Sequence, residues 1–133
     1  MRSRVWVGLA LLSIVAVAVA SAQNSPVLGQ VKIPFKFMVG KTEMSAGRYE
    51  VVKQEGHQST LVLRNLDNNK STFLHVIEQL AETDPGAKHK AKVVFDEVGD
   101  QRFISECWPA NNSDGYLVGV TKGEQKHVIV TQD

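Results

Sequence analysis

The chain has 133 residues, 43% of them hydrophobic, and carries 15 Lys and Arg against 14 Asp and Glu, a formal net charge of +1. This balance argues against nucleic-acid binding, which depends on a surplus of Lys and Arg to neutralise phosphates. Cys107 is the only cysteine, which excludes an intramolecular disulfide, so stability must come from an apolar core.

The first 22 residues have the pattern of a secretory signal peptide. Arg2 and Arg4 precede an apolar run over 5–19, and Ala20 to Ala22 is an A-x-A-like cleavage site. A run of about 15 residues is short for a membrane span, which needs about 20. We therefore expect export to a periplasm or beyond, removal of residues 1–22, and a product without a membrane span.

The next segment is expected to lead into a single β-domain. Residues 23–29 are polar and contain a proline, which predicts a flexible lead-in to one domain over 30–133. Apolar residues alternate with others from Val31 to Val39, the pattern of a strand with one face on a core. Because Pro34 has no N–H to donate, we expect an edge strand.

Three further strands are predicted in the middle of the chain. Arg48–Gln54 and Thr60–Asn65 are short β-rich runs separated by polar turn residues. Ser71–Leu80 is apolar on both faces, which predicts a central strand and places His75 in a core or an interface. Polar residues with a Pro-Gly pair predict a loop over Glu82–Lys90.

The clearest hairpin signal lies near the C-terminus. Ala91–Val98 and Gln101–Trp108 flank a two-residue Gly-Asp connector, which is typical of a tight β-turn. A polar loop follows over Pro109–Gly115. Two short strands are predicted last, at Tyr116–Val120 and His127–Thr131.

Short strands at intervals of about ten residues, without helical periodicity, indicate an all-β fold. We expect an antiparallel β-sandwich or a partly closed β-barrel of about seven to eight strands.

Two runs of the sequence resemble a known pattern. Ile33–Gly40 followed by Met44–Val51 is similar to a PFxFxVG…AGxYxV opening, and the hairpin over 92–108 extends the likeness. This opening resembles that of small exported bacterial proteins of acidobacterial type, described as hypothetical. The resemblance implies a compact β-domain outside the cytoplasm, and it carries over no activity and no binding residue. Ser45 departs from the pattern, which usually has Pro there.

The candidate functional residues surround the loop after the hairpin. Trp108, Asn111 and Asp114 are of the types that a sugar-binding surface uses, and Glu106 lies just before them. Loops on β-scaffolds often carry function, so we predict a ligand-binding loop mouth. The alternative is that Trp108 is a rim residue packed over the end of the fold.

Other chemistry-bearing residues give weaker signals. His57, His75, His89 and His127 lack the local spacing of a zinc site, so we predict no metal. Cys107 alternates with its strand neighbours and is expected to be a buried small hydrophobe rather than a nucleophile or an intermolecular disulfide. The sequence therefore predicts no catalytic residue and no cofactor.

The sequence favours an exported, non-catalytic β-domain that binds an unidentified ligand or an envelope protein. A lipocalin-like barrel for an apolar ligand is one alternative, and it requires an internal cavity. A carbohydrate or metal-dependent hydrolase is another, and it requires Glu106, Asp114 and a histidine in one cleft. A third is assembly through the strand containing Pro34, which Lys32 and Lys36 discourage.

Overall fold

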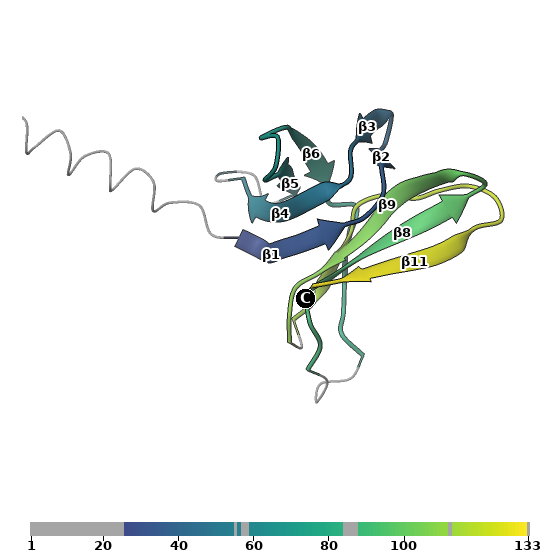
Figure 1. Cartoon of the computed structure of the whole chain (residues 1–133). Coiled ribbons are helices and arrows are strands. Elements are labelled where there is room, and N and C mark those ends of the chain that lie inside the picture. The colour runs from purple at the N-terminus through teal and green to yellow at the C-terminus, as the bar shows by residue number, and fades with distance from the viewer. Residues whose placement is uncertain (1–25, 55, 57–58, 84–87, 112, 133) are drawn as a thin grey trace, which may run out of the picture.

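The computed structural model describes residues 26–54, 56, 59–83, 88–111 and 113–132, which form two β-sheets and no helix (Figure 1). The expected signal peptide over 1–22 lies outside the described residues. The strands are β1 (Pro26–Ile33), β2 (Phe37–Val39), β3 (Thr42–Met44), β4 (Gly47–Lys53), β5 (Thr60–Asn65), β6 (Ser71–His75), β7 (Glu78–Leu80), β8 (Lys92–Val98), β9 (Gln101–Trp108), β10 (Gly115–Leu117) and β11 (Lys126–Thr131).

The strands are divided between a smaller and a larger sheet. The four-stranded sheet has the order β1-β4-β5-β6. The seven-stranded sheet has the order β11-β8-β9-β10-β7, and β2 joins it by pairing with β3 and β9. The first and last strands of each sheet do not pair with each other, so neither sheet closes into a barrel. The predicted barrel is therefore wrong, and the fold is a β-sandwich.

Aromatic side chains from both sheets meet in the core between them. The ring of Phe37 lies 5.3 Å from that of Tyr49 and 5.2 Å from that of Phe95, measured between centroids, with edge-to-face geometry. All three side chains are essentially inaccessible to solvent. Alternation along β4 and β5 supplies the apolar residues around them, because every second side chain faces the core. These are Tyr49 and Val51 on β4 and Leu61 and Leu63 on β5.

The start of the domain differs from the prediction in two ways. The expected single strand over 31–39 is wrong: β1 ends at Ile33 and β2 begins at Phe37, in the other sheet. Pro34 lies at this crossing, where its missing N–H breaks the ladder. The flexible lead-in is wrong for 26–29, which belong to β1, and Leu28 is only 1% exposed. β1 is an edge strand of the smaller sheet, but Pro34, on which the prediction of an edge strand rested, lies outside it.

The predicted central strand over 71–80 is also wrong. It is divided into β6 and β7, each at the end of its sheet's strand order. Phe73 and Ile77 are 53% and 58% exposed, and His75 is exposed rather than in a core. Phe73 lies on the outer face of an edge strand and Ile77 lies between the two strands, so exposed apolar side chains give this segment the composition of a buried strand.

Two predictions in the central and C-terminal parts are confirmed. Thr60–Asn65 is β5 with the expected boundaries. The hairpin forms from β8 and β9, which pair from Val98 and Gln101 outward, with Gly99 at φ +59° in the turn. A glycine suits that position because side chains disfavour positive φ. The strand count is eleven rather than seven to eight because two predicted strands are each divided in two and β3 was not predicted.

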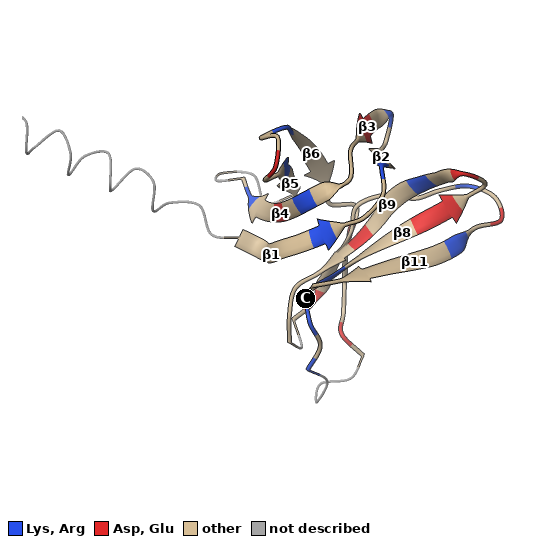
Figure 2. Cartoon of the chain, in the orientation of Figure 1, with Lys and Arg blue, Asp and Glu red and all other residues tan. Residues whose placement is uncertain are grey.

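Acidic and basic residues are mixed on the larger sheet. Figure 2 shows acidic positions on β8 beside basic positions on β9 and β11. Glu97 of β8 lies between two basic residues. Its carboxylate forms an ion pair of 2.9 Å with Arg102 of β9, and it lies opposite Lys126 of β11. Cross-strand pairs of opposite charge help to set the strand register.

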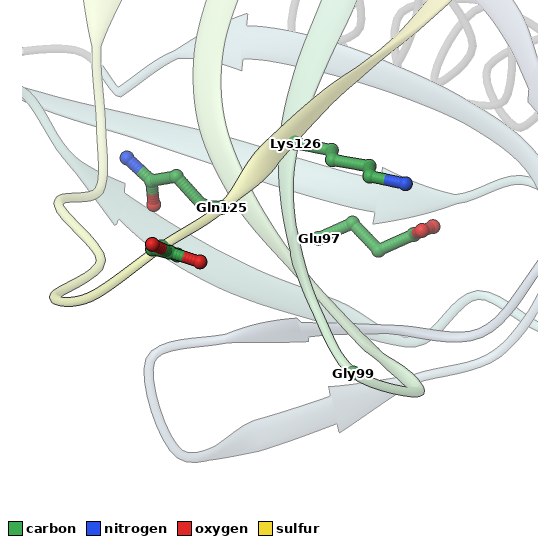
Figure 3. Close-up of a pocket in the computed structure, with 5 residues that line it drawn as sticks. Glu97, Gly99, Gln125 and Lys126 are labelled. Carbon is green, nitrogen blue, oxygen red and sulfur yellow. The ribbon is translucent and has the colours of Figure 1, made fainter.

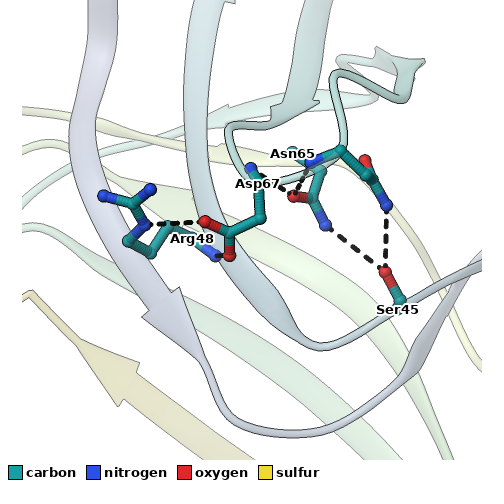
Figure 4. A network of polar contacts seen from close by, with 5 residues as sticks. Ser45, Arg48, Asn65 and Asp67 are labelled. Carbon is teal, nitrogen blue, oxygen red and sulfur yellow. Dashed lines mark hydrogen bonds and ion pairs between the residues drawn. The ribbon is translucent and has the colours of Figure 1, made fainter.

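A polar network ties the connection before β4 to the turn after β5 (Figure 4). The buried side-chain oxygen of Asn65 accepts hydrogen bonds from the backbone N–H groups of Asp67 and Asn68, at 2.8 and 3.2 Å. The Asn65 amide nitrogen lies 3.4 Å from Ser45 Oγ. Arg48 donates to the Asp67 carboxylate from both its backbone N–H and its Nε, at 3.0 and 2.8 Å.

Asp67 should make stability depend on pH in the acid range. The hydrogen bond from the Arg48 backbone N–H, and then that from its side chain, lowers the pKa of Asp67 below its usual 3.8. A lowered folded-state pKa contributes stability that is present above the unfolded-state value and lost as the pH falls through the folded-state value. We expect the stability difference between the wild type and Asp67→Asn to shrink on acidification from about pH 7 to about pH 2. Urea unfolding across this range measures it, and a constant difference would contradict the assignment.

Candidate functional site

The end of the β8–β9 hairpin forms a corner around Trp108. Trp108 is the last residue of β9 and lies opposite Lys92, the first residue of β8. The indole ring covers Gly115 of β10 so closely that a Cβ there would lie 2.4 Å from the indole Cδ2. Lys92 Nζ lies 5.4 Å from the ring centroid. Glycine at the start of β10 thus provides the surface on which the ring rests.

Polar side chains fix the edges of the indole ring. Trp108 Nε1 donates a hydrogen bond of 2.8 Å to Glu106 Oε1. The ring of His89 meets the indole edge-to-face with centroids 6.4 Å apart. His89 Nε2 lies 2.9 Å from Glu82 Oε2, and both side chains are mostly buried. These contacts join Glu82 and His89 to the end of the hairpin.

A cleft of about 440 Å³ opens at this corner. Its wall combines two carboxylates, an ammonium group, a hydroxyl and an indole with small and apolar side chains. Such a mixture can bind a polar ligand through hydrogen bonds and hold its less polar face against the aromatic ring. The lining residues are Leu80, Ala81, Glu82, Thr83, Lys92, Glu106 and Trp108.

The four predicted site residues are near one another but do not share one cleft. Glu106 and Trp108 line the cleft, which we call the Trp108 cleft. Asp114 accepts a hydrogen bond of 3.2 Å from the Glu82 backbone N–H, yet it lines a second cleft of about 580 Å³. Asn111 adopts φ +68°, and its N–H donates to the His89 carbonyl at 2.6 Å, so its backbone positions the loop.

Three ionisable residues of this corner, Glu82, His89 and Lys92, were not predicted. Counting along the hairpin would not have found Lys92, because equal distances from the Gly-Asp turn place it opposite Cys107. A register shift between Val94 and Phe95 moves it opposite Trp108. Glu82 and His89 come from a loop whose path the sequence does not specify.

The histidines and acidic residues do not gather around a common centre in the described part of the chain. His57 lies outside it, and His75 is exposed on β6. His127 Nδ1 lies 3.0 Å from the Asp96 carboxylate, which is buried. Within the described ranges, no three His, Cys, Asp or Glu residues are grouped so that they could hold a metal ion.

Cys107 is buried beside this corner, as predicted, and we expect it to be chemically inert. Burial, followed by the nearby Glu106 charge, raises the pKa of its thiol to about 12. The thiolate is the reactive form, so little of it exists at neutral pH. An aromatic disulfide reagent should label Cys107 only after denaturant is added, which absorbance follows directly. Rapid labelling of the native protein would show that the side chain is accessible.

A third cleft, of about 570 Å³, lies at the opposite end of the hairpin. Figure 3 shows the side chains of Glu97 and Lys126 on one side of the strands and that of Gln125 on the other. These polar groups diverge, whereas the residues around Trp108 contact one another. The Trp108 cleft is therefore the better candidate site.

Comparisons with other proteins identify no relative. No protein-family model, curated protein or solved structure matches this chain. The described residues contain no helix long and apolar enough to cross a membrane.

Proposed function

We propose that this protein is an exported, non-catalytic binding module and that its ligand is an oligosaccharide held in the Trp108 cleft. The observation that carries the proposal is the ordered indole, fixed by Glu106 on one edge and by Gly115 beneath it, at the wall of a polar cleft. Side chains held in place before binding lose little freedom when a ligand arrives.

The chemistry of the cleft suits a hydroxyl-rich ligand. The carboxylates of Glu82 and Glu106 accept hydrogen bonds, and the ammonium group of Lys92 donates them. A sugar presents hydroxyls that do both, and its C–H face packs against an aromatic ring. The cleft volume of about 440 Å³ is within the range of small-molecule sites.

Two observations support a non-catalytic role. A carbohydrate hydrolase of the kind considered above requires the Glu106 and Asp114 carboxylates in one cleft, but these residues line different clefts. Burial and the high pKa of Cys107 disfavour a thiol nucleophile.

The sandwich core, filled by Phe37, Tyr49 and Phe95, gives no support to an internal lipocalin-like site.

Export is part of the proposal and rests on the N-terminal pattern over 1–22. The ligand would then be an envelope glycan outside the cytoplasm, or a glycan attached to an envelope protein. When the full-length gene is expressed in a secreting bacterium, the mass of the purified protein should correspond to a chain beginning at Gln23. A mass that includes residues 1–22 would contradict export with cleavage.

A thermal-shift screen with oligosaccharides tests the binding role. A ligand that binds the native state raises the unfolding midpoint by an amount that grows with its concentration. Glu106→Gln should reduce that shift because it removes the charge that holds the indole N–H. Glu43→Gln is the matched control, since Glu43 is an exposed acid that pairs with Lys36 on another part of the sheet. Equal shifts in both variants would place the ligand elsewhere.

A further inference from the structure

One edge of β6 has no neighbouring strand in the described part of the chain. β6 pairs with β5 and ends the strand order of the smaller sheet. At one end of this ladder, Val76 N–H donates to the Ser59 carbonyl at 2.8 Å. At the other end, Asn65 N–H donates to the Lys70 carbonyl at 2.8 Å. Bonded and non-bonded pairs alternate in an antiparallel ladder, so the even-numbered residues of β6 face β5. The N–H and C=O groups of the odd-numbered residues point to the open edge: Ser71, Phe73 and His75.

The side chains at this edge continue an apolar row on the outer face of the sheet. Phe73 lies opposite Val62, which lies opposite Val52. Both valines are partly buried, while Phe73 is 53% exposed at the end of the row. The exposed ring and the open backbone groups therefore occur on the same residue.

The edge strand β1 at the opposite side of the sheet carries features that discourage pairing, and β6 does not. β1 begins with Pro26, exposes Lys32 and has two register shifts against β4. Prolines, exposed lysines and irregular register are the usual means of protecting a sheet edge. β6 has the sequence Ser-Thr-Phe-Leu-His, without proline and without Lys, Arg, Asp or Glu.

We propose that β6 pairs antiparallel with β6 of a second copy of this chain, about a two-fold axis at Phe73. In this register Phe73 lies opposite the partner's Phe73, and Ser71 lies opposite the partner's His75. The residues that meet are those whose N–H and C=O groups point outward, so each pair can exchange two hydrogen bonds. The two four-stranded sheets become one continuous sheet, and their apolar rows join.

The register centred on Phe73 explains why a second copy of this chain is a suitable partner for the open edge of β6. An isologous interface requires a surface complementary to itself under a two-fold rotation. A strand centred on an aromatic residue meets this requirement, because identical rings meet at the axis and aromatic cross-strand pairs are favourable. No like charges face each other, since β6 carries none of the four charged residue types.

Sedimentation velocity over a range of concentrations tests the proposal on the protein secreted from its full-length gene. We expect a monomer–dimer equilibrium. Phe73→Glu places two carboxylates at the axis and should raise the dimer dissociation constant by about tenfold or more. Ile129→Glu is the matched control, because Ile129 is a similarly exposed apolar residue on an end strand of the other sheet. It should leave dimerisation unchanged.

A cysteine at the axis gives a second readout that also reports the register. Cα atoms of a bonded antiparallel pair lie about 5.5 Å apart, within disulfide reach. Oxidised Phe73→Cys should run as a covalent dimer, and Thr131→Cys on β11 should not. Buried Cys107 does not compete. A wild type that stays monomeric, a dimer that survives Phe73→Glu, or a Phe73→Cys variant that does not crosslink would each overturn the proposal.

Discussion

Replacing Phe95 with Ala is expected to lower the free energy of unfolding by about 3–5 kcal/mol. Phe95 is 0% exposed, and its ring contacts those of Phe35 and Phe37 edge-to-face, with centroids 5.0 and 5.2 Å apart. Phe35 and Phe37 lie where the chain passes from one sheet to the other, so the substitution leaves a cavity at the junction of the two layers. The lost aromatic contacts add to the cost of the cavity.

Urea unfolding followed by circular dichroism measures this change. Total stabilities of small domains are about 5–15 kcal/mol, so the variant should keep only part of its stability. Ile129→Ala is the control, because that side chain is 58% exposed. It should cost less than about 1 kcal/mol. Similar losses in the two variants would mean that Phe95 does not occupy a packed core.

Gly115→Ala is expected to destabilise the fold by about 1–3 kcal/mol and to displace the indole of Trp108. A Cβ at this position would lie 2.4 Å from Cδ2 and 2.6 Å from Cε3 of the ring. The ring is rigid and is held at its N–H by Glu106, so it cannot give way without losing that hydrogen bond. The variant should therefore also weaken binding in the Trp108 cleft.

Tryptophan fluorescence reports the displacement directly. The sequence has two tryptophans, Trp6 and Trp108, and removal of residues 1–22 leaves only Trp108. Gly29→Ala is the matched control, because a Cβ there would meet only the amide end of the flexible Gln132 side chain, at 3.0 Å. An unchanged emission spectrum and unchanged stability in Gly115→Ala would contradict the observed packing.

The parts of the fold that sequence predicted well are those specified by local patterns. The Gly-Asp turn determines the pairing of β8 with β9 from Val98 and Gln101 as far as Phe95 and Ile104, because a two-residue connector leaves few possible registers. Alternation along β5 determines which side chains face the core, and Leu61 and Leu63 are buried accordingly. Cys107 is buried for the same reason.

The parts that sequence predicted poorly depend on contacts between distant segments. Alternation continues through Pro34, so periodicity alone does not show that the chain changes sheet there. Phe73 is exposed because its strand lies at the edge of the smaller sheet, and Ile77 is exposed in the connection from β6 to β7, where the chain passes to the other sheet. Neither strand order nor such a crossing is a local property. Five of the seven residues that line the Trp108 cleft were missed for the same reason, since residues 80–83 and Lys92 reach it from other parts of the chain.

The most direct test of the account is to follow the indole N–H signal of Trp108 by nitrogen–proton correlation NMR while oligosaccharides are added. A chain that begins at Gln23 has one tryptophan and so gives one such signal. Because this N–H donates to Glu106 at the wall of the cleft, an oligosaccharide bound there should shift the signal progressively to saturation. If the signal stays fixed while the thermal-shift screen shows binding, or if no oligosaccharide moves it at millimolar concentration, the Trp108 cleft is not the binding site that we propose.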